Sequence, residues 1–220
     1  PGSFSHYYDT MSFGALRVRG AVGLRVYQSS QQLGSYLADD STLEGRFGRF
    51  SLEILTQADA DLDFARFDND GPDGIPDSGD DDGVVDALFI VLAAAPTNFL
   101  VGSATGVAGL GFGEETAAAD PSAEGRELIT GDRSASGQPI RISADQGTIQ
   151  QGRSLAEAVG SMCHEYGHVL GLPDLYNVQF MGQPGALPEA DGAGVGNWCL
   201  MGWGASGWEP GDGPTSLGAW

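Results

Sequence analysis

Residues 164–174 read His-Glu-Tyr-Gly-His-Val-Leu-Gly-Leu-Pro-Asp. If residues 153–170 form a helix, the side chains at 164 and 168 share one face, because positions i and i+4 do so on any helix. Both imidazoles can then approach a single point at the Zn–N distance of about 2.0–2.1 Å. Glu165 lies beside the first of them, where a carboxylate reaches a water on the metal without binding the metal. This pattern indicates a zinc hydrolase with Glu165 as its base.

The residues after the two histidines predict the end of the helix and a third ligand beyond it. Gly171 permits a positive φ, so the chain can turn there, and Pro173 prevents the helix from resuming. Asp174 then lies where a chain folding back beneath the helix offers a third ligand. A carboxylate oxygen binds zinc at about 2.0–2.2 Å. A glutamate further along, such as Glu189, is the alternative third ligand.

A second segment, 196–204, reads Gly-Asn-Trp-Cys-Leu-Met-Gly-Trp-Gly. Met201 stands between bulky and glycine residues in this segment. A thioether beneath a metal site provides a soft apolar floor that adapts to the ligands. The alternative is an ordinary core methionine in a glycine-rich turn.

An acidic loop occupies residues 68–86, which read Asp-Asn-Asp-Gly-Pro-Asp-Gly-Ile-Pro-Asp-Ser-Gly-Asp-Asp-Asp-Gly-Val-Val-Asp. Calcium takes about six to eight oxygen ligands, and aspartates that alternate with glycines let a short loop supply them. Carboxylates without a counter-charge repel one another, and a divalent ion relieves that repulsion. We expect one or two structural calcium ions, bound by some of Asp68, Asp70, Asp73, Asp77, Asp80, Asp82 and Asp86. The alternative is a solvated acidic surface.

The chain resembles the immune inhibitor A-like metallopeptidases of the metzincin group. The resemblance is carried by the zinc-type stretch 164–176, by Gly-Asn-Trp-Cys-Leu-Met-Gly at 196–202 and by Asp-Gly-Val-Val-Asp-Ala-Leu-Phe-Ile-Val at 82–91. Residues 8–20 and 214–220 are similar to the family more weakly. The chain departs from the family pattern in the acidic insertion between residues 70 and 82 and in residues 97–125.

This resemblance implies a secreted, zinc-dependent endopeptidase with calcium sites, acting on protein or peptide substrates. It assigns one catalytic zinc ion to His164, His168 and Asp174, catalysis to Glu165, and the Met-turn to Met201. In such a fold Cys163 and Cys199 are neighbours, because the Met-turn lies below the zinc helix. A disulfide between them would suit an oxidising compartment. Two small buried thiols are the alternative.

Composition limits the partners of the 220-residue chain. It has 30 acidic and 10 basic residues, all ten of them arginine, and a formal charge of −20. Nucleic acid and anionic membrane surfaces require clustered positive charge, so neither is an expected partner. The apolar run 87–95 is far shorter than the roughly 20 residues of a membrane helix. We expect residues 1–220 to form a single catalytic domain cut at both ends from a longer protein.

The remaining patterns predict a mixed α/β (α+β) domain. The resemblance implies that it is a metzincin-like catalytic domain, in which a twisted mixed sheet carries the active-site helix and the Met-turn. Apolar residues at helical spacing predict helices, and short apolar or alternating runs predict strands. The expected helices span 4–12, 43–64 and 153–170. The expected strands span 15–27, 84–94, 127–130 and 139–149, with irregular structure at 68–83 and a long loop through most of 101–137.

These observations predict a zinc-dependent endopeptidase in which Glu165 acts as the general base. Tyr176 and Trp203 are candidates for stabilising the oxyanion of the reaction. Three alternatives stay open: a calcium-binding structural or adhesion module with a non-catalytic zinc site, a zinc hydrolase whose third ligand is Glu189, and a hydrolase of non-peptide substrates. An intact Glu165 argues against the first of these, because a decayed site has no reason to keep its base.

Overall fold

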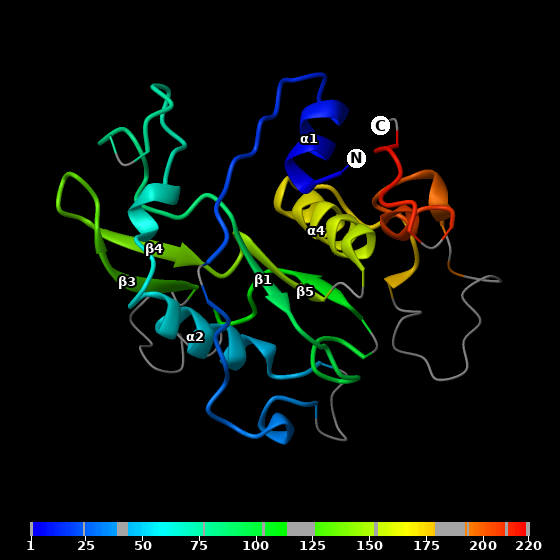
Figure 1. Ribbon diagram of the computed structural model, residues 1–220, viewed down its shortest axis with the longest axis horizontal. Coiled ribbons are helices and arrows are strands. Elements are labelled where there is room, and N and C mark those ends of the chain that lie inside the picture. Colours follow the sequence, from blue (N-terminus) through cyan, green and yellow to red (C-terminus); the bar gives the residue numbers. More distant parts are fainter. Residues whose placement is uncertain are drawn as a thin grey trace.

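The computed structural model describes residues 2–23, 25–38, 44–76, 78–102, 104–113, 126–151, 154–178, 192, 194–209 and 211–218. Within this part of the chain, helices α1 (Phe4–Met11), α2 (Phe47–Ala58) and α4 (Leu155–Val169) surround two small β-sheets (Figure 1). The predicted mixed α/β architecture is therefore confirmed.

The larger sheet has the strand order β1-β5-β2. Strand β1 (Leu88–Leu92) runs parallel to β5 (Gly147–Gln151), and β2 (Gly106–Ala108) runs antiparallel to β5 at the edge of the sheet. Strands β3 (Glu127–Arg133) and β4 (Pro139–Ser143) form a separate antiparallel pair. The larger sheet is thus mixed, with β2 leaving one edge without a neighbour among the described residues.

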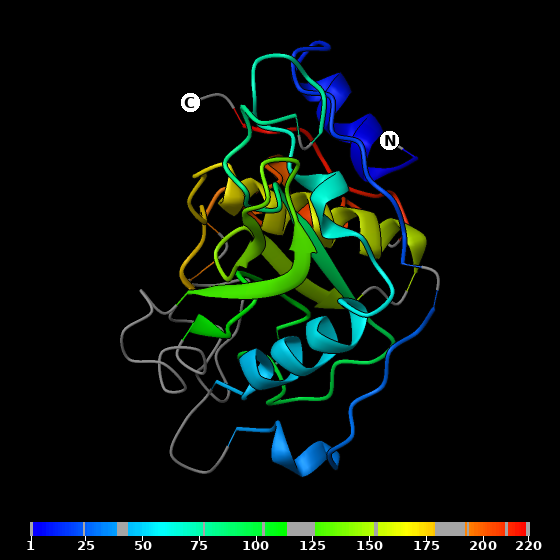
Figure 2. The ribbon, with the colours of Figure 1, turned by 90° about the vertical axis from the view of Figure 1, so that its left-hand side faces the viewer.

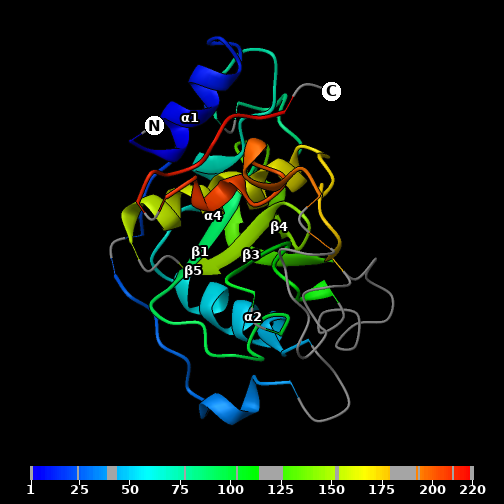
Figure 3. The ribbon, with the colours of Figure 1, turned by 90° about the vertical axis from the view of Figure 1, so that its right-hand side faces the viewer.

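Helices α2 and α4 lie on opposite faces of the larger sheet (Figures 2 and 3). Successive side chains of a strand point to opposite faces, and β1 follows this rule. Ile90 and Leu92 pack into the cluster that contains Phe47 of α2, whereas Phe89 packs against the cluster that contains Val159 of α4. The sheet therefore has a core on each face, and α4 is held against it by the second of these cores.

The boundaries of α4 are explained by its sequence. Ser154 is its N-cap and accepts a hydrogen bond from the amide of Glu157, which satisfies one of the free amides of the first turn. At the other end Gly171 has φ +85°. The amides of Gly171 and Leu172 donate to the carbonyls of His168 and Gly167, as in a Schellman motif. The predicted end of the helix at Gly171 is confirmed.

Several predicted elements differ from the structure. The described residues of 15–27 contain no strand, and Val22 and Val26 are exposed because no other strand pairs with the segment. Residues 139–149 form two strands separated by a turn, and β1 is shorter than the expected strand 84–94. Alternation of apolar and polar residues is thus not enough to make a strand without a partner to bond.

Other boundaries also shift. The expected helix 43–64 is the shorter α2, followed by a 3₁₀ turn at Phe64–Phe67. Strand β2 lies in the region expected to be a loop, and β3 is longer than predicted. The described residues of 68–83 have no regular structure, as expected. Among the described helices, none has the length and hydropathy needed to cross a membrane.

Candidate metal centre

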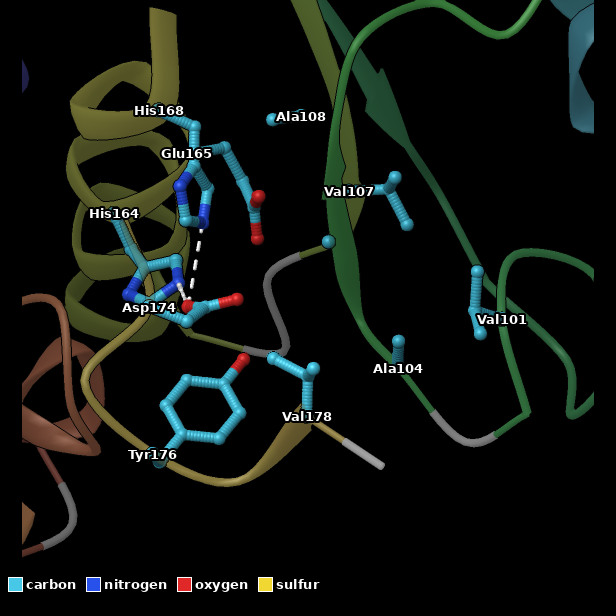
Figure 4. A pocket seen from close by; sticks show the side chains of 11 residues that line it. Val101, Ala104, Val107, Ala108, His164, Glu165, His168, Asp174, Tyr176 and Val178 are labelled. Atoms are coloured by element: carbon cyan, nitrogen blue, oxygen red, sulfur yellow. Dashed lines mark hydrogen bonds and ion pairs between the residues drawn. The ribbon is translucent and has the colours of Figure 1, made fainter. Parts of the chain in front are cut away.

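The side chains of His164, His168 and Asp174 converge beside α4 (Figure 4). One potential ligand atom from each lies within 4.8 Å of the other two. Oδ1 of Asp174 is 3.1 Å from Nε2 of His164 and 3.3 Å from Nε2 of His168. The turn at Gly171 brings the aspartate back to the two imidazoles, which is the arrangement that the sequence predicts for three ligands of one ion.

Backbone carbonyls fix the orientation of both imidazoles. Nδ1 of His164 lies 2.8 Å from the carbonyl oxygen of Leu200, and Nδ1 of His168 lies 2.8 Å from that of Leu172. A carbonyl only accepts, so each Nδ1 donates and each Nε2 is left for the shared point. This second layer of bonds is typical of histidines that bind metals. The donor set of two imidazole nitrogens and one carboxylate oxygen fits zinc.

The three groups shift one another's protonation. Burial lowers the pKa of His164 and of His168, but the hydrogen bond to Asp174 and the charge of Glu165 outweigh burial, and both pKa values lie above the ordinary value. Burial opposes ionisation of Asp174, yet its bonds to the two imidazoles hold its pKa well below the usual range. The carboxylate therefore stays ionised at neutral pH and balances part of the imidazole charge.

Glu165 projects from α4 toward β2 (Figure 4). It is only 8 % exposed. Burial raises the pKa of its carboxyl, and the neighbouring imidazoles oppose that shift. The backbone amide of Ala108 in β2 also lowers the pKa of this carboxyl. The group is thus close to the three convergent side chains but is held against the sheet instead of joining them.

Met201 lies directly behind the metal-facing part of α4. It is fully buried, and a Cβ built on Gly167 would lie 2.5 Å from its Sδ atom. Gly167 therefore allows the methionine to approach the helix backbone between the two histidines, which is the position expected for a Met-turn. Helix α1 is bonded to the same helix, because the hydroxyl of Tyr8 donates a hydrogen bond to the carbonyl oxygen of Cys163, 2.5 Å away.

His164, His168 and Asp174, here called the ligand trio, line a cavity of about 290 Å³. Its other lining residues are mostly apolar and come from β2 and its flanks and from the chain after Asp174: Val101, Ala104, Gly106, Val107, Ala108, Tyr176 and Val178. The Tyr176 hydroxyl points toward Asp174 (Figure 4). Burial, with the charges of Asp174 and Glu165, raises the pKa of Tyr176, so the phenol is neutral. Trp203, the other oxyanion candidate, is not among the described residues that line this cavity.

The predicted disulfide is absent from the structure. Cys163 and Cys199 are both buried free thiols, and Sγ of Cys199 accepts a hydrogen bond from the amide of Gly218, 3.0 Å away. The two side chains share an apolar cluster with Met201 and Tyr7, and burial raises the pKa of Cys163 to about 12. Packing in this cluster, and not a covalent bridge, joins the zinc-type helix to the Met201 segment.

The acidic loop contains a second convergent group, formed by Asp68, Asp70 and Asp81, whose ligand atoms lie within 4.8 Å of one another. Asp68 is 1 % exposed, and its Oδ1 has no hydrogen-bond partner among the described residues. Burial, with the charges of Asp81 and Asp82, raises the pKa of Asp68 to about 6. A buried, unpaired carboxylate oxygen next to two further carboxylates is the donor chemistry that calcium prefers.

The other predicted calcium ligands bond within the loop. Asp73, Asp80, Asp82 and Asp86 accept hydrogen bonds from Ile75, Ser78, Val84 and Asn69, respectively. Asp77 lies outside the described residues, as does Glu189, the alternative zinc ligand. Asp81 was not among the predicted calcium ligands, although its two neighbours Asp80 and Asp82 were. Which of three adjacent aspartates points inward is set by the turn and not by the residue type.

Comparison with known families agrees with this geometry. The family model of the immune inhibitor A peptidase M6 catalytic domain matches residues 2–220. The protein is therefore a metallopeptidase, a metal-dependent hydrolase of peptide bonds. It belongs to the immune inhibitor A peptidase M6 family. No curated protein shows significant sequence similarity to the chain.

Proposed function

We propose that this metallopeptidase is a zinc-dependent endopeptidase in which His164, His168 and Asp174 bind the ion and Glu165 is the general base. The convergence of the three ligand atoms within 4.8 Å carries this proposal. The backbone carbonyls of Leu200 and Leu172 support it, because they leave both Nε2 atoms available to one ion. The same observation favours Asp174 over a more distant glutamate as the third ligand.

The chain's own residues supply the proton transfers. When bound, a zinc ion polarises the scissile carbonyl and makes water a nucleophile at neutral pH. Glu165 accepts the proton of the attacking water and delivers it to the leaving amine. Its buried position beside apolar cavity walls raises its pKa, which strengthens it as a base. Tyr176 remains the candidate donor to the oxyanion, because its hydroxyl faces the same cavity.

The substrate is proposed to lie along β2. This strand forms the edge of the larger sheet and lines the cavity with Val107 and Ala108. Edge strands carry free amides and carbonyls that pair with an added extended peptide. A peptide bound in this way continues past the metal centre in both directions, which supports cleavage inside a chain. The apolar walls at Val101 and Val178 favour uncharged side chains next to the cleaved bond.

The decisive experiment is Glu165→Gln, a replacement of nearly equal size. We expect casein hydrolysis to fall by at least about 10²–10⁴-fold, the usual contribution of a general base, with one zinc ion still bound. Glu209→Gln, an exposed residue outside the cavity, is the matched control and should keep full activity. Zinc content by mass spectrometry and activity with and without a chelator complete the measurement.

A variant that binds zinc and keeps activity would show that Glu165 is not the base. Zinc-loaded wild-type protein that cleaves no peptide would instead favour a structural or adhesion module. Hydrolysis of ester substrates without any cleavage of casein would favour a non-peptide hydrolase. The structural module and the non-peptide hydrolase therefore give different outcomes in the same assay.

We also propose that Asp68, Asp70 and Asp81 bind one structural calcium ion. The support is the buried Oδ1 of Asp68 without a partner and the proximity of the other two carboxylates. The amide of Gly83 donates to Oδ2 of Asp68 at 3.0 Å, so the site is anchored just before β1. A bound ion would therefore order the loop and the entry to the sheet together.

We propose a secreted protein in which residues 1–220 belong to one catalytic domain. The family match of one catalytic domain spans residues 2–220, which supports a single domain. Secretion is supported by the family resemblance alone, because the free thiols remove the disulfide that would have favoured an oxidising compartment. Peptides are the proposed partners, and the charge of −20 argues against nucleic acid.

A further inference from the structure

Gly106, the first residue of β2, faces α4. It lies opposite Gln150 in the antiparallel pairing of β2 with β5, and opposed residues place their side chains on the same face of a sheet. Gln150 and its neighbour on that face, Thr148, are fully buried. Helix α4 packs against both strands. A side chain at position 106 would therefore project into the layer between the sheet and the helix.

That space is already filled by the helix. A Cβ built on Gly106 would lie 2.6 Å from Oε1 of Glu165 and 2.7 Å from Oγ of Ser161. Both distances are shorter than real Cβ atoms tolerate. The backbone of Gly106 does not have a positive φ, so the strand conformation itself does not call for glycine. The close approach of the Glu165 carboxylate is the physical reason for glycine at this position.

The same strand also favours the ionised form of this carboxylate. The backbone amide of Ala108, two residues further along β2, lowers the pKa of Glu165. Gly106 thus provides the room in which the carboxylate lies against the sheet. If a Cβ entered at 106, the flexible end of Glu165 could move away at small cost in stability. The position of the carboxylate would change while the fold would not.

We propose that Gly106 is a positioning residue for peptide hydrolysis. The absence of its side chain lets the carboxylate of Glu165 lie against β2, in the place from which it acts on the attacking water. This proposal rests on the proposed role of Glu165 as the general base. It assigns a catalytic requirement to a residue of the substrate-side strand that carries no reactive group.

The test is Gly106→Ala. A displacement of about 1 Å in a catalytic group costs up to about 10²-fold, so we expect kcat to fall by about 10–100-fold. KM should stay within about twofold, since the added methyl group is directed at Ser161 and Glu165 of α4 and a displaced base weakens an interaction made only in the transition state. The thermal midpoint should change by no more than about 2 °C, with zinc content unchanged. In a crystal structure of the zinc-free variant the Glu165 carboxylate should be displaced from its wild-type position, with the fold unchanged.

Gly147→Ala is the matched control on the neighbouring strand. Its Cβ would lie 2.8 Å from the Leu110 side chain and from the Leu88 carbonyl, away from Glu165. It should lower the thermal midpoint but leave kcat per zinc-loaded, folded molecule unchanged. An inactive Glu165→Gln together with a Gly106→Ala kcat within about threefold of wild type would overturn the proposal. So would a Glu165 carboxylate that is not displaced, or a drop in midpoint as large as that of the control. An active Glu165→Gln would instead overturn the proposed function.

Discussion

The ligand trio at α4 and the acidic trio in the loop each gather three metal-type side chains, but their charges are balanced differently. At α4 a single carboxylate meets two imidazoles, and the pKa of Asp174 is held well below the usual range. In the loop three carboxylates meet, and the pKa of Asp68 is raised to about 6 by burial and neighbouring charges. Attraction thus assembles the first group, whereas repulsion opposes the second.

Because of this difference, a bound ion would have a different role at each site. The imidazoles of the first group are oriented by the carbonyls of Leu200 and Leu172, so its geometry is set by the fold, and the proposed zinc ion would serve the chemistry. The second group contains a buried oxygen of Asp68 without a partner among the described residues, so the proposed calcium ion would serve stability. Removing one aspartate should therefore have opposite consequences in the two places.

The largest effect is expected for Asp174→Asn at the first site. The amide keeps the shape of the side chain but loses the charge, so zinc affinity should fall by more than the roughly 10–100-fold that loss of an outer partner costs. Casein hydrolysis at limiting zinc should fall in parallel. Zinc affinity is measured by competition with a chromophoric chelator.

Asp68→Asn is the crossed control for that measurement, because it removes one charge from the other trio. It should leave zinc affinity unchanged. If Asp174→Asn binds zinc as tightly as wild type, Asp174 is not a ligand and the zinc site is formed by other residues.

A smaller effect is expected from calcium at the second site. With zinc present throughout, calcium at a hundredfold excess over its Kd should stabilise the fold by about 2.7 kcal/mol. About 1 kcal/mol shifts the thermal midpoint by roughly 2–4 °C in a chain of this size. Asp68→Asn should lose most of this response, whereas Asp73→Asn should keep it, because Asp73 only accepts a bond from Ile75. If added calcium does not change the thermal midpoint of wild-type protein that was calcium-free at the start, the acidic trio does not bind a stabilising calcium ion.

The convergence of His164, His168 and Asp174 beside α4 could be predicted from the sequence. The i, i+4 spacing of the two histidines lies on a helix whose end is marked by Gly171, and local chemistry alone fixes these features. Asp174 is predictable as well, because the turn at Gly171 leaves the chain few directions. The contact between His164 and the Leu200 carbonyl could not be predicted from the sequence, because the residue type of a distant segment does not show where its backbone atoms will lie.

The loop and the sheet edge were predictable only in outline. The aspartate pattern indicated a calcium site, but the participation of Asp81 depends on turn geometry. Strand β2 lies in a region rich in small residues without a period, and it is a strand because β5 pairs with it. The reverse holds for Val22 and Val26, which alternate like a strand but find no partner. Tertiary pairing decided these cases, and a single sequence does not contain it.

The smallest predicted effect is the pH dependence of stability in protein free of calcium and zinc. Loss of the carboxylate charge should have opposite effects on stability at the two sites. The folded-state pKa of Asp68 is raised from 3.8 to about 6. The folded state therefore keeps a proton there that the unfolded state loses, and stability falls as the pH rises from about 4 through 6. Asp68→Asn lacks this penalty, so above pH 6 it should melt a few degrees higher than wild type, and near pH 4 the difference should vanish.

Asp174→Asn should show the opposite sign at pH 7. The pKa of Asp174 is lowered in the folded state, so its carboxylate stabilises the fold above the unfolded-state value of about 3.9, and this contribution is lost only as the pH falls toward the folded-state value. The variant should therefore melt lower than wild type at pH 7, by an amount that shrinks in strong acid. Thermal melts of both variants from pH 4 to pH 7.5 measure the two signs. If both substitutions shift the midpoint in the same direction at pH 7, the charges of the two sites are balanced alike and the contrast between them is wrong.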